Sequence, residues 1–288
     1  MTMIKETQWP SSKPAKDADL LRGWLLQEKY HGVETPGYFA DLKRIEGGEP
    51  LAYVIGWVDF LGCRINLSPR LPHRRGQVRP LIPRPETEFW VERAISQIQT
   101  NYHVLTDRLI HGSLRKDTHA QKRILDMFAG SGCMGIALLK HLPHVAVDFG
   151  EKNSVLCKQI EENIALNNID SARTHVIQTD IFSGITGSYD FIFANPPYID
   201  PIKKDTVQVS VLTHEPHDAL FADDSGLCFI KKLLTEGGAH LKQKGVMYVE
   251  FGEDQKDHVA KLARDEGWKC EFYKDQFGVW RVARLTIS

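Results

Sequence analysis

Strand-like and helix-like patterns alternate along the second half of the chain, from residue 123 onward. The apolar run RILDMF, for example, is followed by two glycines and then by the helix-like segment MGIALLKHL. Such alternation predicts a mostly parallel sheet with helices on both faces. The last two strand patterns, CEFYKD and VWRVARLTI, have no helix between them, so we expect the final strand to run antiparallel. The predicted fold is therefore an α/β, doubly wound sheet with an antiparallel C-terminal strand.

The N-terminal part of the chain is organised differently. Apolar residues at helical spacing predict a helix over residues 17–31, and a second helix is expected from Pro36 to Gly47. The segment YVIGWVDFLGCRINL then predicts two short strands joined by a turn. We accordingly expect two domains: residues 1–75, a small helical subdomain with a β-hairpin, and residues 76–288, the α/β domain.

Composition narrows the class of protein. A net charge near −1 gives no overall attraction to nucleic acid or to a membrane surface. The five cysteines include no CxxC pair, which argues against a structural zinc site or a disulfide framework and favours a reducing compartment. No apolar run approaches the roughly 18–20 residues that span a bilayer, and the N-terminal segment lacks the apolar core of a signal peptide. We expect a cytoplasmic protein, monomeric and without a metal site.

A glycine-rich loop follows the first strand of the alternating region and opens a helix. It contains GxGxxG from Gly130 to Gly135, in the context where glycines let the backbone pass close to a ligand. Glu151 ends the next strand pattern, where a carboxylate can accept both hydroxyl hydrogens of a ribose. The pair predicts an adenosine-type ligand. It leaves open whether that ligand is a nicotinamide dinucleotide or S-adenosylmethionine, and a plain strand-to-helix turn is the simplest alternative.

Asp180 ends the third strand pattern, beside Ile181 and Phe182. An acid next to apolar side chains suits an adenine ring with its exocyclic amine. A turn cap is the competing interpretation of Asp180, because Asp is common at such positions. Asp148 competes with Glu151 for the ribose, and we favour Glu151 because it stands at the end of its strand, just before the helix.

The fourth strand pattern, FIFA, ends in Asn195-Pro196-Pro197-Tyr198. A planar NH₂ group is a weak nucleophile, and two carbonyl acceptors can orient it toward an electrophilic methyl group. The side chain of Asn195 and the backbone carbonyl of Pro196 can supply those acceptors. The prolines stiffen the turn, and Tyr198 can pack against a flat substrate group. This motif therefore favours methyl transfer over hydride transfer, with Asn195, Pro196 and Tyr198 in the catalytic roles and Asn195 to Tyr198 as the substrate site.

Three blocks occur in the order LIPRPETE at 81–88, DMFAGSG at 126–132 and NPPY at 195–198, and in this the chain resembles the HemK/PrmC-type methyltransferases. Further matches are PLAYVIG, NIALNNI and EPHDALFADDSGL, so the resemblance covers residues from about 50 to 288. The family implies a Rossmann-like class I fold and S-adenosylmethionine as the cofactor. It implies methylation of the side-chain amide nitrogen (N5) of the glutamine in the Gly-Gly-Gln motif of peptide-chain release factors.

The resemblance also implies residue roles. The loop Phe128, Ala129, Gly130, Ser131 and Gly132 would line the methionine and ribose. Glu151 would hold the ribose, Asp180 and Ile181 would lie near the adenine, and Asn195 would touch both cofactor and substrate. LIPRPETE would form a turn braced by Arg84, Glu86 and Thr87, and residues 1–75 would dock the release factor. The family usually has glycine where this chain has Phe128.

Two other interpretations stay open. An adenine-N6 or other nucleic-acid methyltransferase could use the same NPPY site, and the basic loop at residues 70–79 speaks weakly for nucleic-acid contact. That loop looks like an insertion relative to the family. A catalytically silent cofactor-binding module, or an NAD-binding protein, would also carry GxGxxG.

Overall fold

The structure is a computed structural model that describes residues 18–68, 78–110 and 121–287, without the side chains of residues 101–110. The chain divides into two compact units, residues Met1–Gly56 and Trp57–Ser288. The boundary predicted near residue 75 falls outside the described residues. The β-hairpin, which we expected in the N-terminal domain, belongs to the second unit, because it begins at Trp57.

The described part of the first unit contains α1 (Ala18–Tyr30), α2 (Pro36–Glu46) and α3 (Leu51–Ile55). The helix α2 begins where expected, with Pro36 at its first position and the Thr35 hydroxyl accepting a hydrogen bond from the Tyr38 amide at 3.2 Å. The predicted strand content of residues 53–55 is wrong, because these residues belong to α3. That helix ends at Gly56, whose φ of 99° lies in the left-handed region.

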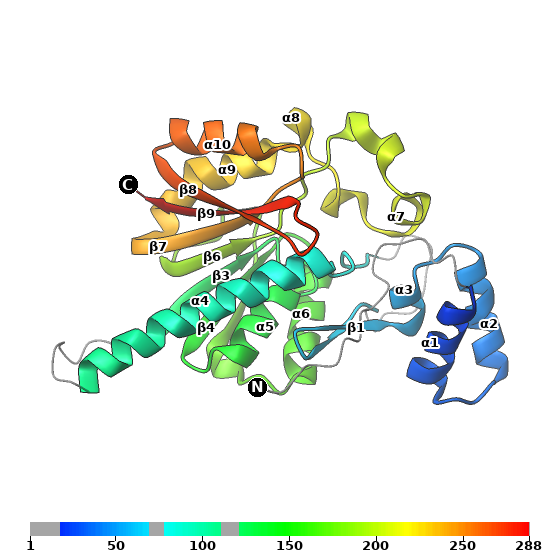
Figure 1. Cartoon of the computed structure of the whole chain (residues 1–288). Coiled ribbons are helices and arrows are strands. Elements are labelled where there is room, and N and C mark those ends of the chain that lie inside the picture. Colours follow the sequence, from blue (N-terminus) through cyan, green and yellow to red (C-terminus); the bar gives the residue numbers. More distant parts are fainter. Residues whose placement is uncertain (1–17, 69–77, 111–120, 288) are drawn as a thin grey trace. The chain divides into compact units, whose positions relative to one another are not determined.

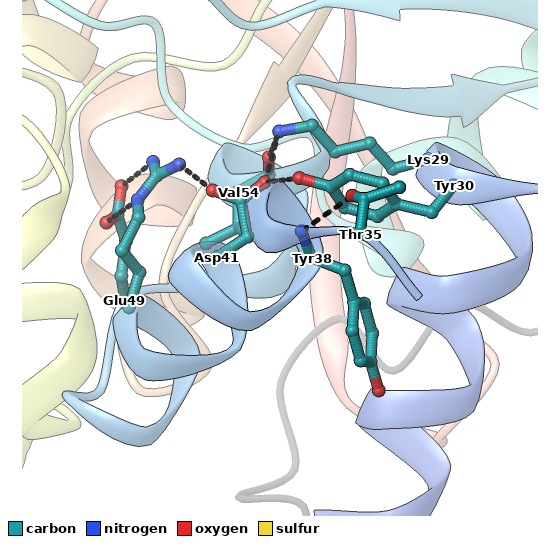
Figure 2. Close-up of polar contacts among 8 residues, drawn as sticks. Lys29, Tyr30, Thr35, Tyr38, Asp41, Glu49 and Val54 are labelled. Carbon is teal, nitrogen blue, oxygen red and sulfur yellow. Dashed lines mark hydrogen bonds and ion pairs between the residues drawn. The ribbon is translucent and has the colours of Figure 1, made fainter. Parts of the chain in front are cut away.

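A buried carboxylate links the helices of the first unit (Figure 2). Asp41 accepts hydrogen bonds from the Tyr30 hydroxyl and the Arg44 guanidinium, both at 2.7 Å, and Lys29 lies 2.6 Å away. Burial alone would raise the pKa of Asp41, but these donors hold it below its ordinary value. Lys29 also donates to the carbonyl of Val54, so α1, α2 and α3 share one polar network.

Within the described part of the second unit, seven strands form one sheet in the order β5-β4-β3-β6-β7-β9-β8. The strands from β3 to β7 pair in parallel, whereas β9 pairs antiparallel with both β7 and β8. The predicted doubly wound sheet with an antiparallel C-terminal strand is confirmed, and β9 lies between β7 and β8. Their bounds are β3 (Lys122–Met127), β4 (Val145–Glu151), β5 (Thr174–Gln178), β6 (Tyr189–Ala194), β7 (Leu241–Glu250), β8 (Trp268–Lys274) and β9 (Trp280–Ile287).

Helices cover both faces of this sheet (Figure 1). On one face lie α4 (Pro85–Ile110), α5 (Cys133–His141) and α6 (Ser154–Leu166); on the other lie α9 (Cys228–Glu236) and α10 (Lys256–Asp265). The polar stretch at residues 101–122 predicts a loop with one short helix, whereas α4 continues to Ile110. Between β6 and α9 the chain forms the short helices α7 (Val209–His214) and α8 (Asp223–Gly226), which the sequence patterns did not predict.

The β-hairpin consists of β1 (Trp57–Phe60) and β2 (Cys63–Asn66). Its strand β2 is fastened to α6, since the Asn66 amide donates to Oδ1 of Asn163 at 2.8 Å and the Arg64 amide donates to Oδ1 of Asn167 at 3.0 Å. Asn163 also donates to the carbonyl of Ser131 at 2.9 Å. The hairpin and the glycine loop are therefore held by one buried asparagine side chain.

Candidate active site

The predicted site residues converge on the carboxyl edge of the parallel strands. The glycine loop follows β3, Glu151 ends β4, Asp180 follows β5 and Asn195 follows β6. Met127 of β3 pairs with Gly150 of β4 on one side and with Ala194 of β6 on the other, so these three strands end together. In open α/β sheets this edge, where the strand order reverses, is where ligands bind.

The glycine loop is a tight left-handed turn. Phe128, Gly130 and Gly132 have φ values of 61°, 55° and 78°. A positive φ at position 128 accounts for the glycine usual in the family, because only glycine adopts it without strain. In this chain the Phe128 ring packs edge-on against Phe229 of α9, with 5.5 Å between ring centroids. That contact offsets part of the strain and brings an aromatic ring to the loop.

Glu151 fastens the loop to the end of β4. One carboxylate oxygen accepts the Gly130 amide at 2.9 Å and the other accepts the Asn153 amide at 2.8 Å. The residue is buried, with 9% of its surface exposed. A carboxylate offers about four lone-pair sites, so each oxygen keeps capacity for a further donor such as a ribose hydroxyl. The position suits the predicted ribose role, and it has a second, structural role in the turn.

Asp126, near the end of β3, is a site residue that sequence reasoning missed. Its Oδ2 accepts the Gly135 amide at 2.8 Å, whereas its Oδ1 has no hydrogen-bond partner among the described residues. Complete burial, together with the charge of Glu151, raises the pKa of Asp126 to about 8 even though the Gly135 amide lowers it. Asp126 therefore holds the first turn of α5 through the Gly135 amide, and its burial favours the neutral carboxyl at neutral pH.

The predicted adenine residues have different environments. The Asp180 side chain is exposed and pairs with Lys152 at 2.9 Å. Ile181 is buried in the core and has a φ of 53°. Residues 180–183 also line an open hollow of about 560 Å³, together with residues of α9 and of the turn at 237–240. The glycine loop and Glu151 do not line this hollow.

The NPPY turn is held by side chains that come from distant segments. Asn195 is half-buried, and its Nδ2 donates to the Thr87 hydroxyl at 3.2 Å. The Tyr198 hydroxyl donates to Oε1 of Glu250 at 3.1 Å, and Gln255 donates to the backbone carbonyl of Tyr198 at 2.8 Å. Pro196 and Pro197 are buried. Three hydrogen bonds with side chains from distant segments thus hold the turn.

Glu250, the last residue of β7, lies at the centre of these contacts and was not singled out from the sequence. It has no exposed surface, and its Oε2 accepts hydrogen bonds from the Thr87 hydroxyl and from the Trp90 indole, each at 2.7 Å. Burial raises the pKa of Glu250, although the donors Trp90 and Thr87 and the charge of Arg281 lower it. A buried carboxylate in a strand is costly unless donors surround it, as they do here.

Only the first half of LIPRPETE lies outside a helix. The helix α4 begins at Pro85, so PETE forms its first turn and not part of the predicted turn. Arg84 pairs with the buried Glu215 at 2.9 Å, and the Ile82 amide donates to the same carboxylate at 3.3 Å. Two segments that carry the resemblance, 81–88 and 215–227, are therefore joined by a buried ion pair. Arg84 and Thr87 brace the site region as expected.

The strand order, the left-handed glycine loop, the acid at the end of β4 and the NPPY turn together define a class I, S-adenosylmethionine-dependent methyltransferase. The family model described as "Methyltransferase small domain" matches residues 106–225. The release factor glutamine methyltransferase of Streptococcus pneumoniae is 30% identical over 90% of this chain and 83% of its own length. The chain belongs to the family of release factor glutamine methyltransferases.

Other similar proteins carry the same description. The release factor glutamine methyltransferase of Thermodesulfovibrio yellowstonii is 31% identical over 83% of this chain and 77% of that protein. Among solved structures, the release-factor-specific protein-(glutamine-N5) methyltransferase of Alicyclobacillus acidocaldarius is 24% identical, with a TM-score of 0.40, and covers 74% of this chain and 99% of that one.

Among residues 18–68, 78–110 and 121–287, no three His, Cys, Asp or Glu side chains are grouped so that they could hold a metal ion. In the same part of the chain, no helix combines the length and apolar character needed to cross a membrane. The basic loop predicted at residues 70–79 lies outside the described residues except for its last two positions.

Proposed function

We propose that this chain transfers a methyl group from S-adenosylmethionine to the side-chain amide nitrogen of the glutamine in the Gly-Gly-Gln motif of a peptide-chain release factor. The observation that carries the proposal is the position of Asn195, which follows β6 directly beside the end of β3 and its glycine loop. Family membership supports the glutamine as substrate, because the relatives are named for it.

The residues of the NPPY turn suit a neutral amide. An amide nitrogen shares its lone pair with the carbonyl and is a weak nucleophile. Asn195 Oδ1 and the carbonyl of Pro196 would accept its two N–H bonds and orient the nitrogen, with Tyr198 against the flat amide. Orientation of two reactants can supply up to roughly 7–11 kcal/mol of barrier reduction, so a strong base is not required. In this proposal Asn195, Pro196 and Tyr198 are the catalytic residues, and Pro197 shapes the substrate site.

The residues at the neighbouring strand ends fit the cofactor, which supplies an activated methyl group bound to sulfonium. Spare acceptor capacity on Glu151 suits ribose hydroxyls. The loop from Phe128 to Gly132 would lie along the methionine and ribose, while Asp180 and the backbone at Ile181 would face the adenine. Asn195 would complete the boundary between cofactor and substrate.

Residues 1–75 would dock the release factor, and we propose a cytoplasmic monomer. The near-neutral charge gives no support to nucleic acid as a competing substrate. Supplying purified release factor, single-stranded DNA and RNA separately with radiolabelled S-adenosylmethionine compares these acceptors directly. We expect label in the release factor alone. Label in nucleic acid at a higher rate would instead favour the adenine-N6 activity.

A further inference from the structure

Asn195 is useful as an acceptor if its amide presents oxygen, and not nitrogen, to the substrate. We infer that Thr87 and Glu250 set this orientation, with Thr87 as a positioning residue that acts through Asn195. The inference rests on the proposed function, and it adds two residues that lie 108 and 55 positions from Asn195 in the chain.

The direction of each hydrogen bond follows from the chemistry of its partners. Glu250 when ionised can accept hydrogen bonds and cannot donate them. Its Oε2 already receives the Trp90 indole N–H, which is a donor in every state. With Glu250 ionised, the hydroxyl hydrogen of Thr87, 2.7 Å from the same oxygen, therefore points to Glu250. The lone pairs of the Thr87 oxygen are then the groups that face Asn195.

An oxygen that presents lone pairs selects the amide nitrogen of its neighbour. Asn195 Nδ2 lies 3.2 Å from the Thr87 hydroxyl and donates to it. With the amide turned over, Asn195 Oδ1 would meet an oxygen whose one hydrogen is already used by Glu250, and the two would repel. Among the described residues the hydrogen bond of the Asn195 side chain is the one that its Nδ2 donates to Thr87, so Oδ1 stays available as an acceptor.

The side chains that orient Asn195, namely Thr87, Trp90 and Glu250, are held rigidly because each is buried and packed. Thr87 is 2% exposed in the first turn of α4, which Pro85 begins. Trp90, one turn further on, stacks on Phe193 of β6 with 5.8 Å between ring centroids. Since Ala194 of β6 pairs with Val249 of β7, the residues that follow, Asn195 and Glu250, leave adjacent strands at the same level. The orientation of Asn195 is thus built into the sheet and α4.

The test compares Thr87→Val, which keeps the shape and removes the hydroxyl, with Thr87→Ser, which keeps the hydroxyl. With release factor as substrate, we expect Thr87→Val to lower kcat about 10- to 100-fold, because the Asn195 amide would lose the partner that holds its oxygen toward the substrate, and a preorganised acceptor would be lost with it. Thr87→Ser should stay within about threefold of the original enzyme. The Kd for S-adenosylmethionine should be unchanged in both variants, and Thr87→Ala serves if the valine variant does not fold.

A double-mutant cycle separates positioning from general support of the fold. If Thr87 acts through Asn195, then Thr87→Val should change kcat by less than about twofold when Asn195 is already alanine. An equal loss in both backgrounds would overturn the inference, as would full activity of Thr87→Val alone. Absence of release factor methylation by the unaltered enzyme would instead contradict the proposed function, so the two failures are distinguishable.

Discussion

The proposed cofactor side of the site, around Glu151, and the proposed amide side, around Asn195, are built in different ways. On the cofactor side, Glu151 binds the backbone amides of Gly130 and Asn153, all within one stretch of chain. On the amide side, Asn195 and Glu250 are joined through Thr87, and the contacts span more than 100 residues of sequence. One side is a local motif and the other is a buried network of side chains. A local motif can bind a common cofactor, whereas the specific substrate requires groups assembled by the whole domain.

This difference predicts that the two sides can be damaged separately. The largest effect is expected for Asn195→Ala, which removes the proposed acceptor for the substrate amide. We expect kcat to fall by about 10²–10³-fold, as when a preorganised hydrogen-bonding group of an active site is removed. Calorimetric titration should show S-adenosylmethionine binding nearly unchanged. Turnover within threefold of the original enzyme would contradict the role of Asn195.

The next effect concerns Gly226, which packs against the NPPY turn. Its φ is 81°, and a Cβ atom there would lie 2.1 Å from the backbone carbonyl oxygen of Tyr198. Gly226→Ala must therefore push the turn out of place, and we expect at least tenfold lower kcat and about 2 kcal/mol or more of lost stability. Gly238→Ala is the matched control, because its Cβ would meet its nearest atoms at 3.7 Å. Equal behaviour of the two variants in chemical denaturation and turnover would refute the expectation.

On the cofactor side, Glu151→Gln keeps the size of the side chain and replaces one acceptor oxygen with a donor. We expect the Kd for S-adenosylmethionine to rise about tenfold, roughly the value of one charge-assisted hydrogen bond. At saturating cofactor, kcat should recover to near the original value, which is the reverse of the pattern for Asn195→Ala. Isothermal titration and kinetics at several cofactor concentrations measure both quantities. An unchanged Kd would count against the ribose role.

A further effect concerns the pH dependence of stability. The pKa of Asp126 is about 8 in the folded chain, well above its ordinary value of 3.8. Stability from the neutral carboxyl is thus fully present below about pH 4 and is lost as the pH rises through about 8. In Asp126→Asn this decline should disappear from urea unfolding of the cofactor-free protein. The control Asp190→Asn should act at lower pH and in the opposite sense, because Lys122 and Lys242 lower the pKa of Asp190 despite its burial.

An identical pH slope between pH 4 and 8 in the Asp126→Asn variant and the unaltered protein would contradict the assignment. The decline in unfolding free energy between pH 4 and 8 should also remain in Asp190→Asn, and its loss in that variant would contradict the assignment as well.

Sequence patterns predicted the sheet, and they led to the residues of the proposed cofactor side, because both depend on local features. The strand before Gly130 and the acid Glu151 at the next strand end are visible as spacing along the chain. Glu250 is an acid at the end of the apolar run GVMYVE, and nothing nearby in sequence marks it as the acceptor for Thr87 and Trp90. The burial of Ile181 and the ion pair of Arg84 with Glu215 likewise depend on tertiary packing, which no local pattern encodes.

Two helical segments were not predicted because their residue types favour other structures. These are residues 53–55 of α3 and the second half of α4. YVI is rich in residues that favour strands, but packing in the first unit makes it the end of α3. Polar residues after position 100 suggested a loop, yet the helix α4 continues to Ile110.

The central claim is tested most directly by incubating the enzyme with a release factor and S-adenosylmethionine, followed by mass spectrometry of the peptide that contains Gly-Gly-Gln. A release factor with alanine in place of that glutamine is the control. We predict a gain of one methyl group, located by fragmentation on the glutamine side chain, and no gain in the control. An unmodified glutamine under saturating cofactor, or a methyl group at another residue, would contradict the account.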